Sequence, residues 1–488
     1  MWSIGAISLL LGTSLVDGVR LWDVFERDVT ERGVTLVDWE GYMANPAITL
    51  RLALPEQTPY PVDVYLHSSS PRVHFDRESP EDRTGIGRRM RLASEAASTT
   101  FRMATFPDRD GDDEEHTLMI QVFKGGSELS RTLVPVRVLD EDRPALPASY
   151  PLLLNYDEDR TGFFDAEKHR KVLRQAADDW QFFLDDQGVD PTPAGDEQIR
   201  IWNPDGFVST RLVRNPEDYR GFLIFASGIQ HDEMRAGGAP SRQGKPQTRG
   251  GVPTDLRRSG AVNFETRGNW NTLGWFMDDA DDAWWVSGSL RGEPNDFYSI
   301  AVHELGHALG FEGTYPLFRA VKRDGFKDEA LIQYLGFAPT VDASDHFPRV
   351  IDPVSGYGGF GMEYQGQMKS RRWLITKSHL LMLQAIGYRI RPTSAFRGVS
   401  SAFEVEAVNA NVGTEIRVDP KLSGGVPQYR VTVEGGGLPP GLNVDPFTGV
   451  VSGRPSAEGQ WVCVLQVSDQ DPSTPPKRIV VSVKVIAS

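Results

Sequence analysis

The sequence predicts a multidomain fold in which a central α+β domain is flanked by two all-β sandwiches. Three observations lead to this class. A chain of 488 residues is too long for one hydrophobic core, so about three domains are expected. Short alternating runs broken by turn residues, typical of sandwiches, occupy both ends of the chain. Longer segments with helical periodicity lie between them, among further short strands.

The composition is that of an ordinary globular protein and argues against some partners. The formal charge of −15 disfavours nucleic acid or an anionic membrane as the main partner, since both require a basic surface. After the first 18 residues no segment is long and apolar enough to span a bilayer. The one cysteine, Cys463, excludes an intrachain disulfide framework, and we expect it to be a small buried residue of an alternating strand.

Residues 1–27 are expected to form a signal or leader segment. An apolar run is followed by small residues, and cleavage after Gly18 is one outcome of that pattern. No Lys or Arg precedes the run, so the basic start of a signal peptide is missing. The alternative is a buried strand at the start of the first domain.

Residues 28–143 are predicted to form the first sandwich, with alternating runs at 34–37, 47–54, 61–66, 117–123 and 133–139. Two features carry a resemblance in this region: Trp39-Glu40-Gly41 before an alternating strand, and the closing run at 136–142. They resemble a Calx-β or related immunoglobulin-like module. The resemblance implies a β-sandwich, with a surface or polymer ligand as a candidate partner.

One loop of this region is crowded with carboxylates, which are Asp108, Asp110, Asp112 and Asp113. Clustered oxygen ligands make Ca²⁺ a candidate here. The run lacks the D-x-D-x-D-G order of a known calcium loop, and a solvated acidic turn is the competing interpretation.

The central domain is predicted at residues 150–391. An amphipathic helix is expected at 165–184, followed by short strands at 199–202, 222–226 and 261–264. A second helix is expected at 295–311, because apolar residues recur there at three- and four-residue steps. Asn295 or Asp296 can cap its start, and Gly310 supplies a stop.

This second helix contains a metal-binding pattern. His303 and His307 are four residues apart, so both imidazoles lie on one face at a separation that one tetrahedral metal ion can bridge. Glu304 lies about 100° round the helix from His303 and flanks the metal instead of binding it. H-E-x-x-H is the spacing of two zinc ligands and a general base. The alternative is a pair of surface histidines on an ordinary helix.

The stretch from His303 to Gly310 resembles the opening of the metzincin signature, H-E-x-x-H-x-x-G-x-x-H. Gly313 stands where the third histidine of that signature belongs, so another ligand is needed. Residues 337–348 resemble the loop of leishmanolysin-type peptidases that presents the third ligand after a long insertion, which implies His346 in that role. Rivals that remain open are Asp345 and Glu312. His379 lies in a segment that resembles the last helix of these peptidases, where no ligand is found.

The segment Gly361-Met362-Glu363-Tyr364 resembles the Met-turn of the same peptidases. In some relatives a tyrosine two residues after this methionine reaches the metal or the oxyanion, which makes Tyr364 a second catalytic candidate beside Glu304. Phe360 replaces the serine that is common two residues before the methionine, and an ordinary loop tyrosine is the alternative. The whole resemblance covers about residues 152–389 and implies the α+β lobe of bacterial matrixin- and leishmanolysin-like peptidases.

Residues 400–488 are expected to form a separate domain after a linker at 391–394. The run from Gly437 to Pro455 contains L-P-P-G-L and T-G-x-x-x-G-x-P, and it is similar to the putative immunoglobulin-like domain of bacterial surface and secreted proteins. That similarity implies a spacer or a module that binds a surface or polymer ligand.

Together these features predict a secreted or cell-surface zinc endopeptidase that acts on protein or peptide substrates. His303, His307 and His346 would hold Zn²⁺, and Glu304 would take a proton from the attacking water. The alternative is a non-catalytic surface or adhesion protein whose middle lobe is a degenerate protease.

Overall fold

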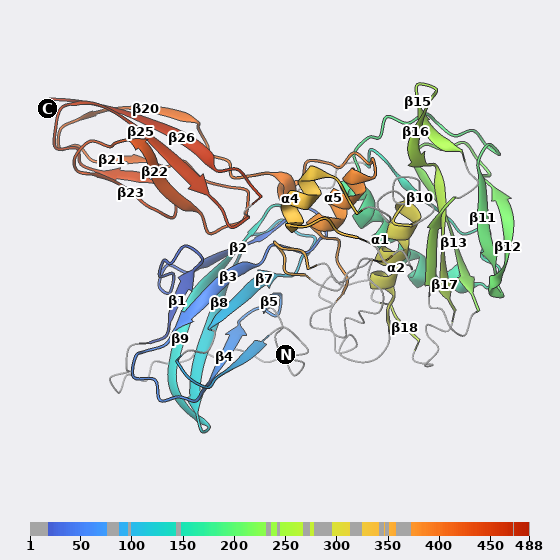
Figure 1. Ribbon diagram of the computed structural model, residues 1–488, viewed down its shortest axis with the longest axis horizontal. Coiled ribbons are helices and arrows are strands. Elements are labelled where there is room, and N and C mark those ends of the chain that lie inside the picture. Colours follow the sequence, from blue (N-terminus) through green and yellow to red (C-terminus); the bar gives the residue numbers. More distant parts are fainter. Residues whose placement is uncertain are drawn as a thin grey trace.

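The computed structural model describes residues 18–75, 87–95, 99–142, 148–230, 236–241, 245–266, 274–277, 295–312, 325–340, 346, 351–357, 372–471 and 473–487. Within these residues the protein is multidomain and mostly β, as the sequence predicts. Three bodies can be followed in Figure 1: an N-terminal module, a central lobe that carries the helices, and a C-terminal module. Among the helices described, none is long and apolar enough to cross a membrane.

The N-terminal module consists of two sheets packed around one apolar core. The first sheet contains, in spatial order, β1 (Arg20–Asp23), β3 (Ile48–Ala53), β7 (Thr100–Thr105) and β5 (Val73–Phe75). The second sheet, in spatial order, contains β2 (Val34–Asp38), β9 (Ser127–Asp140), β8 (Glu114–Lys124), β4 (Val62–Ser68) and β6 (Gly87–Leu92). Alternating burial along β3 and β4 follows from the period-two placement of side chains, with apolar residues facing the core.

The start of this module differs from the prediction that residues 1–27 are a leader. Strand β1 lies inside that range and pairs antiparallel with β3, and Leu21 is fully buried in the core. The alternating apolar residues of this stretch therefore belong to the sandwich. The rest of the predicted leader, residues 1–17, lies outside the described residues.

The central lobe is built on one sheet, in the order β10 (Leu152–Asn155), β13 (Phe222–Ile229), β17 (Ser259–Glu265) and β14 (Ala236–Pro240). The first three strands are parallel and β14 is antiparallel to β17. Every residue of β13 is buried, as expected for a parallel strand covered on both faces. Helices α1 (Glu167–Phe183) and α2 (Phe297–Leu309) share a core with one face of the sheet. The ribbon of β11 (Gln198–Asn203) and β12 (Gly206–Arg214) shares a core with the other face.

Smaller elements complete the described part of this lobe. These are the pairs β15 (Pro246–Arg249) with β16 (Val252–Arg257) and β18 (Trp275–Phe276) with β19 (Asn295–Asp296), the helices α4 (Glu329–Leu335) and α5 (Lys377–Ala385), and the 3-10 turns η1 (Phe163–Asp165) and η4 (Ser394–Phe396). The two long helices lie where the sequence predicts them, and each begins within a few residues of the expected start.

The C-terminal module also has two sheets. The first contains β20 (Val405–Asn411), β26 (Lys477–Ile486), β25 (Gly459–Ser468) and β22 (Arg430–Gly436), and the second β21 (Ile416–Val418), β24 (Val451–Gly453) and β23 (Leu442–Val444). Cys463 is fully buried in their shared core, in agreement with its predicted place in an alternating strand.

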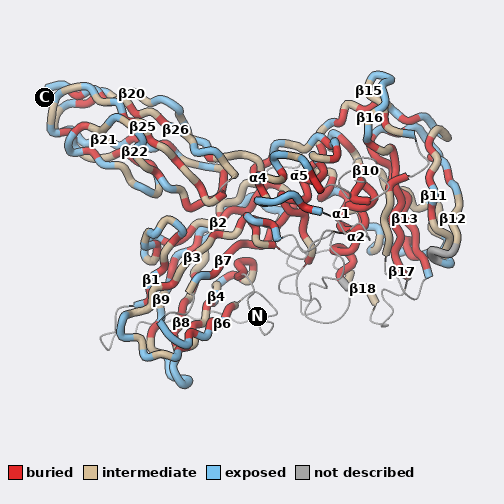
Figure 2. Tube along the Cα trace, viewed as in Figure 1, coloured by how far each residue is buried: buried red, intermediate tan, exposed pale blue. Residues whose placement is uncertain are grey.

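Residues of both flanking modules are buried against the central lobe; Figure 2 colours the chain by how far each residue is buried. Tyr42, Met43 and Phe106 of the N-terminal module belong to the core of the central lobe, as does Val426 of the C-terminal module. Lys377 of α5 forms a buried ion pair with Asp471 at 3.0 Å. The predicted linker at 391–394 is packed too, since Ser394 is buried and its hydroxyl accepts a hydrogen bond from the Glu40 backbone N–H. The modules are therefore less separable than the linker compositions suggest.

Candidate metal centre

Helix α2 is fixed at both ends. The Asp296 carboxylate caps the start by accepting from the Ser299 backbone N–H at 3.0 Å, and buried Arg372 donates to the same carboxylate at 3.1 and 3.2 Å. At the other end, Gly310 has a φ of 137°, in the positive region that favours glycine, and the chain turns away from the helix there. All 13 residues of α2 are buried, so their side chains are held by packing on every side.

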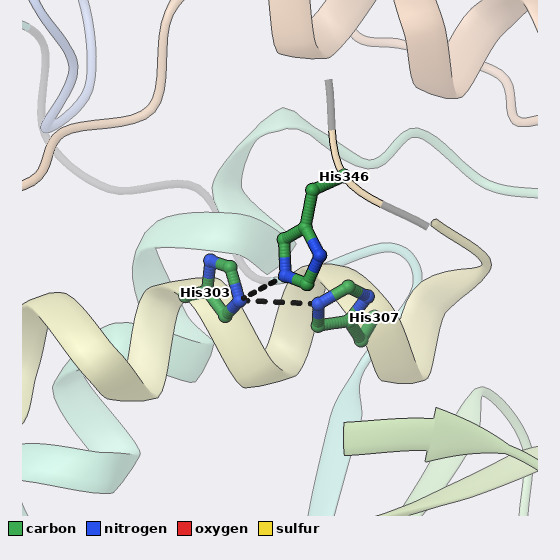
Figure 3. A group of neighbouring side chains, drawn as sticks. All are labelled: His303, His307 and His346. Carbon is green, nitrogen blue, oxygen red and sulfur yellow. Dashed lines mark hydrogen bonds between the residues drawn. The ribbon is translucent and has the colours of Figure 1, made fainter. Parts of the chain in front are cut away.

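The structure brings the three predicted histidine ligands together (Figure 3). His303 and His307 project from adjacent turns of α2, and His346 approaches from a separate segment. The Nε2 atom of His303 lies 3.1 Å from Nε2 of His307 and 3.4 Å from Nε2 of His346. One ligand nitrogen of each residue falls within a group no wider than 4.8 Å.

The geometry of this group fits a zinc ion. In a tetrahedral site with Zn–N bonds of about 2.0–2.1 Å, the ligand nitrogens are separated by about 3.4 Å. Nδ1 of His307 is hydrogen-bonded to the Phe311 carbonyl oxygen, which can only accept, so this imidazole carries its proton on Nδ1 and has a free lone pair on Nε2. Burial lowers the pKa of His303, with smaller contributions from the other two imidazoles, and so favours the neutral form that binds metal.

Glu304 is a buried residue of α2 on the side of the helix that packs against β14. Its carboxylate accepts a hydrogen bond from the Gly238 backbone N–H, which lowers its pKa, but burial dominates and raises the pKa to about 8. The two backbones approach closely as well: a Cβ on Gly238 would lie 2.0 Å from the Glu304 carbonyl oxygen. Only glycine permits this approach. Sequence reasoning missed Gly238, because a glycine in a short strand gives no sign of what it touches.

Trp373 is a further neighbour of the site that the sequence did not single out. Its ring centroid lies 5.4 Å from that of His303, and its backbone N–H donates to the Ser299 hydroxyl at 2.7 Å. The segment that begins at Arg372 therefore touches both the cap of α2 and its first histidine.

The other ligand candidates have different places. His379 is buried in the capping box of α5, where its Nδ1 lies 3.1 Å from the Thr376 backbone N, and burial lowers its pKa to about 4. Glu312 is buried but is not a member of the histidine group. The rival ligand Asp345, the vacated position Gly313 and the catalytic candidate Tyr364 lie outside the described residues, so the role of Tyr364 stays a prediction.

A second group of metal-ligand type lies in the N-terminal module. It joins Asp108 to Asp38, Asp140 and Asp142, with one oxygen of each within 4.8 Å of the others. Of the four aspartates of the acidic loop, which the sequence offers either as a calcium candidate or as a solvated turn, only Asp108 belongs to this group. Asp113 is paired with Arg137 instead. The sequence does not reveal Asp38 and Asp140 as members, because they end two strands that are far apart in the chain and meet only through strand pairing.

This carboxylate group includes a counterion. The buried Arg72 guanidinium forms ion pairs with Asp38 and with Asp108, and its Nε donates to the Phe106 carbonyl oxygen at 2.7 Å. Burial, the largest effect, raises the pKa of Asp140 to about 6 and that of Asp142 to about 7. Asp108 and Asp142 also border a cavity of about 490 Å³ between the N-terminal module and α1.

Comparison with known proteins identifies the C-terminal module. Residues 399–484 match the family model described as "Putative Ig domain". This module is immunoglobulin-like. No curated protein matches the chain.

Solved structures show only weak likeness. A putative α-galactosidase from Bacteroides fragilis is 18% identical over 18% of this chain and 17% of its own, with a TM-score of 0.15. Extracellular cadherin domains 1–4 of protocadherin γB7 are 10% identical over 87% of this chain and 67% of their own, with a TM-score of 0.18. The N-terminal domain of PorA is 13% identical over 25% of this chain and 97% of its own, also at 0.18. The chain thus spans about a sixth of the galactosidase, and likeness at this level carries no argument about function.

Proposed function

We propose that the protein is a secreted or cell-surface zinc-dependent endopeptidase whose central lobe is of the metzincin type. The observation that carries the proposal is the meeting of the three histidine Nε2 atoms of His303, His307 and His346, at 3.1 and 3.4 Å for the two pairs that include His303. Two of the imidazoles come from H-E-x-x-H on a buried helix, with Glu304 adjacent to the first. Three histidine nitrogens are one of the ligand sets of catalytic zinc sites, in which water or substrate takes the fourth position.

The chain's own residues would perform the proton transfers. A zinc ion, when bound, supplies a Lewis acid and lowers the pKa of a coordinating water towards neutrality. Glu304 accepts one proton as the water oxygen attacks the peptide carbonyl carbon. It then returns that proton to the amine as the C–N bond breaks, which yields one carboxylic acid and one amine. The hydrogen bond from Gly238 holds the carboxylate in place for both transfers.

The edge of the central sheet supports a peptide substrate. Among the described residues, β14 pairs with β17 on one side only, and it packs on α2 close to Glu304. An unpaired edge presents backbone N–H and C=O groups with which an extended peptide can form a further strand. A substrate bound there would lie beside the residue proposed as the general base.

The flanking modules are proposed to act outside the reaction. The C-terminal immunoglobulin-like module and the N-terminal sandwich, which we take to be of the Calx-β type, would bind a surface or polymer ligand near the substrate. The net charge of −15 argues against nucleic acid in this role.

Metal content and cleavage of an unfolded protein test the proposal. The purified chain should contain one zinc per molecule and should cleave a denatured substrate, and a chelator should abolish the cleavage. Added zinc should then restore it. Stoichiometric zinc without any cleavage would favour the degenerate lobe of an adhesion protein, and the absence of zinc would overturn the proposed site.

A further inference from the structure

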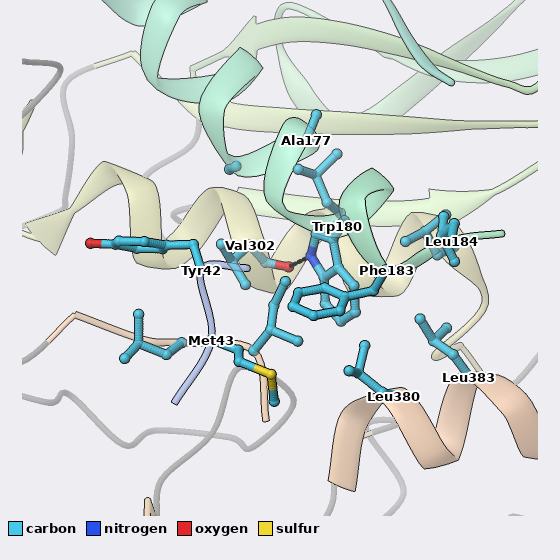
Figure 4. Close-up of a cluster of buried hydrophobic side chains, with 14 of the residues drawn as sticks. Tyr42, Met43, Ala177, Trp180, Phe183, Leu184, Val302, Leu380 and Leu383 are labelled. Carbon is cyan, nitrogen blue, oxygen red and sulfur yellow. Dashed lines mark hydrogen bonds between the residues drawn. The ribbon is translucent and has the colours of Figure 1, made fainter. Parts of the chain in front are cut away.

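The N-terminal module inserts a loop, residues 39–45, into the central lobe behind the histidine helix. In Figure 4 Tyr42 and Met43 lie among side chains of α1, α2 and α5. The Tyr42 ring packs edge-on against Tyr298 in the first turn of α2, with ring centroids 5.8 Å apart. Both rings are buried, with 2% and 0% exposure. This loop therefore contacts α2 itself.

A second loop of the same module reaches α2 through α1. Arg109 donates to both oxygens of Asp179 in α1, at 2.7 and 3.0 Å, and the Tyr298 hydroxyl donates to the same carboxylate at 2.5 Å. The Arg109 guanidinium also lies 4.1 Å from the centroid of the Tyr42 ring. Asp179 is only 3% exposed, so these two donors satisfy a carboxylate that is largely shielded from water.

These contacts act on the side of α2 opposite the histidines. At about 100° per residue, Tyr298 lies about 140° round the helix from His303 and about 180° from His307. On the same side, the Trp180 indole N–H of α1 donates to the Val302 carbonyl oxygen at 2.9 Å (Figure 4). A shift of Tyr298 would therefore rotate or tilt the face that carries both imidazoles.

The 39–45 loop also reaches the other neighbour of the site. Met43 forms a β-bridge with Ile375, and the Ala44 N–H donates to the Ile375 carbonyl oxygen at 2.8 Å. Two residues earlier in the same segment, Trp373 contacts the ring of His303. The N-terminal module thus supports the first histidine both through α2 and through Trp373.

We propose that Arg109, Asp179 and Tyr298 are positioning residues for the metal centre, and that the N-terminal module is part of the peptidase unit. Arg109 holds Asp179, Asp179 holds Tyr298, and Tyr298 sets the orientation of α2. This inference rests on the proposed function, because it assumes that the histidines bind zinc. It adds that a residue of a different module determines how well they do so.

The affinity for zinc and the absorption spectrum of the cobalt-substituted protein test the proposal without any measurement of peptidase activity. Arg109→Ala should raise the Kd for zinc by about tenfold and should shift the visible bands of bound Co²⁺. This is the low end of the loss for groups that hydrogen-bond a metal ligand directly, because Arg109 acts through Asp179 and Tyr298. Arg109→Lys, which keeps the charge, should restore most of the affinity. Tyr298→Phe removes a single hydroxyl and should change both readouts in the same direction, so it replaces Arg109→Ala if that variant fails to fold.

Two controls separate positioning from general stability. Arg137→Ala removes an exposed ion pair of the same module and should leave both readouts unchanged. Val64→Ala opens the core of the module and should lower the Tm without moving the Kd. If Arg109→Ala and Tyr298→Phe both bind zinc with the wild-type Kd and the wild-type cobalt spectrum, this inference is wrong and the proposed function still stands. A wild-type chain that binds no zinc would overturn the proposed function and this inference with it.

Discussion

Among the residues that the structure describes, two groups of side chains have the residue types of a metal site, and they differ in the charge around them. In the central lobe, imidazole nitrogens of His303, His307 and His346 lie close together. In the N-terminal module, four aspartates gather around the guanidinium of Arg72. A cation bound between the imidazoles would be attracted by their converging lone pairs, whereas the carboxylate group already includes a cation in Arg72. We therefore base the expectation of metal binding on the charge around each group and not on the number of potential ligands.

The environments reinforce this difference. Burial lowers the pKa of His303 and so favours the neutral imidazole, which is the form that binds metal. Burial raises the pKa of Asp140 to about 6 and that of Asp142 to about 7. These shifts favour the protonated carboxylic acid, which does not bind metal. We therefore expect zinc at the first group and an ionic cluster without a bound metal at the second.

Removal of the third histidine should have the largest effect. His346→Ala should lose most of the zinc and nearly all cleavage, since two remaining ligands make a weak site. His379→Ala is the matched control, because that imidazole is buried in the cap of α5 and is not a member of the group. The number of zinc ions per chain, measured in both purified variants, shows which histidine is the third ligand. Full occupancy in the His346 variant would move the third ligand elsewhere.

Glu304→Gln should separate metal binding from catalysis. The amide keeps the shape of the side chain but cannot accept the proton, so the rate of cleavage should fall by about 10²–10⁴-fold. Zinc content should stay at the wild-type level, because the carboxylate flanks the metal. Single-turnover cleavage and metal analysis on one preparation provide the measurement. Cleavage at a substantial fraction of the wild-type rate would assign the base to another residue.

Gly238→Ala should damage the site through the backbone. The new Cβ would lie 2.0 Å from the Glu304 carbonyl oxygen, so β14 and α2 must move apart. Overpacking of this kind costs about 1–3 kcal/mol, and we expect a lower Tm together with weaker zinc binding. Gly435→Ala in β22 is the control, since nothing lies within 4 Å of its added Cβ. Equal losses in the two variants would mean that the close approach has no special role.

The smallest effect is expected at the carboxylate group, as a change in pH dependence. Folding raises the pKa of Asp142 from 3.8 to about 7, through burial and through the nearby Asp140 and Asp108, while Arg109 and the Gly41 N–H act in the opposite direction. The folded state therefore binds this proton more tightly. Its contribution to stability is complete below about pH 4 and is lost as the pH rises through about 7.

Asp142→Asn should accordingly reduce the fall in Tm between pH 5 and pH 8, while the amide oxygen can still accept from Gly41. Asp112→Asn, at the exposed end of the acidic loop, should leave that fall unchanged. Millimolar Ca²⁺ at pH 8 should leave the Tm of the wild type where it is. A calcium-dependent rise that disappears in Asp142→Asn would instead make the carboxylate group a calcium site.

The sequence predicts the helices and the mostly β character well, because local spacing carries that information. The cap Asp296, the four-residue step from His303 to His307 and the stop at Gly310 are all encoded within one short stretch. The place of His346 came from a resemblance, and the structure now sets its Nε2 3.4 Å from that of His303.

The supporting contacts could not be predicted, because they join residues that are far apart in the chain. Asp179 occurs in an amphipathic helix, where a carboxylate is expected to face solvent, and only the fold shows it buried under Arg109. Asp38 and Asp140 close two paired strands and meet Asp108 through that pairing. The linker at 391–394 was misleading for the same reason, since its composition does not reveal that Ser394 packs against Glu40.

The buried ion pair between Lys377 and Asp471 limits how this architecture can evolve or be engineered. The immunoglobulin-like module supplies the anion for an ammonium group inside the central lobe. Loss of one partner of such a pair costs about 3–5 kcal/mol. A grafted module could therefore replace the native one only if it carried an acidic residue at the position of Asp471, or if Lys377 changed to an apolar residue at the same time.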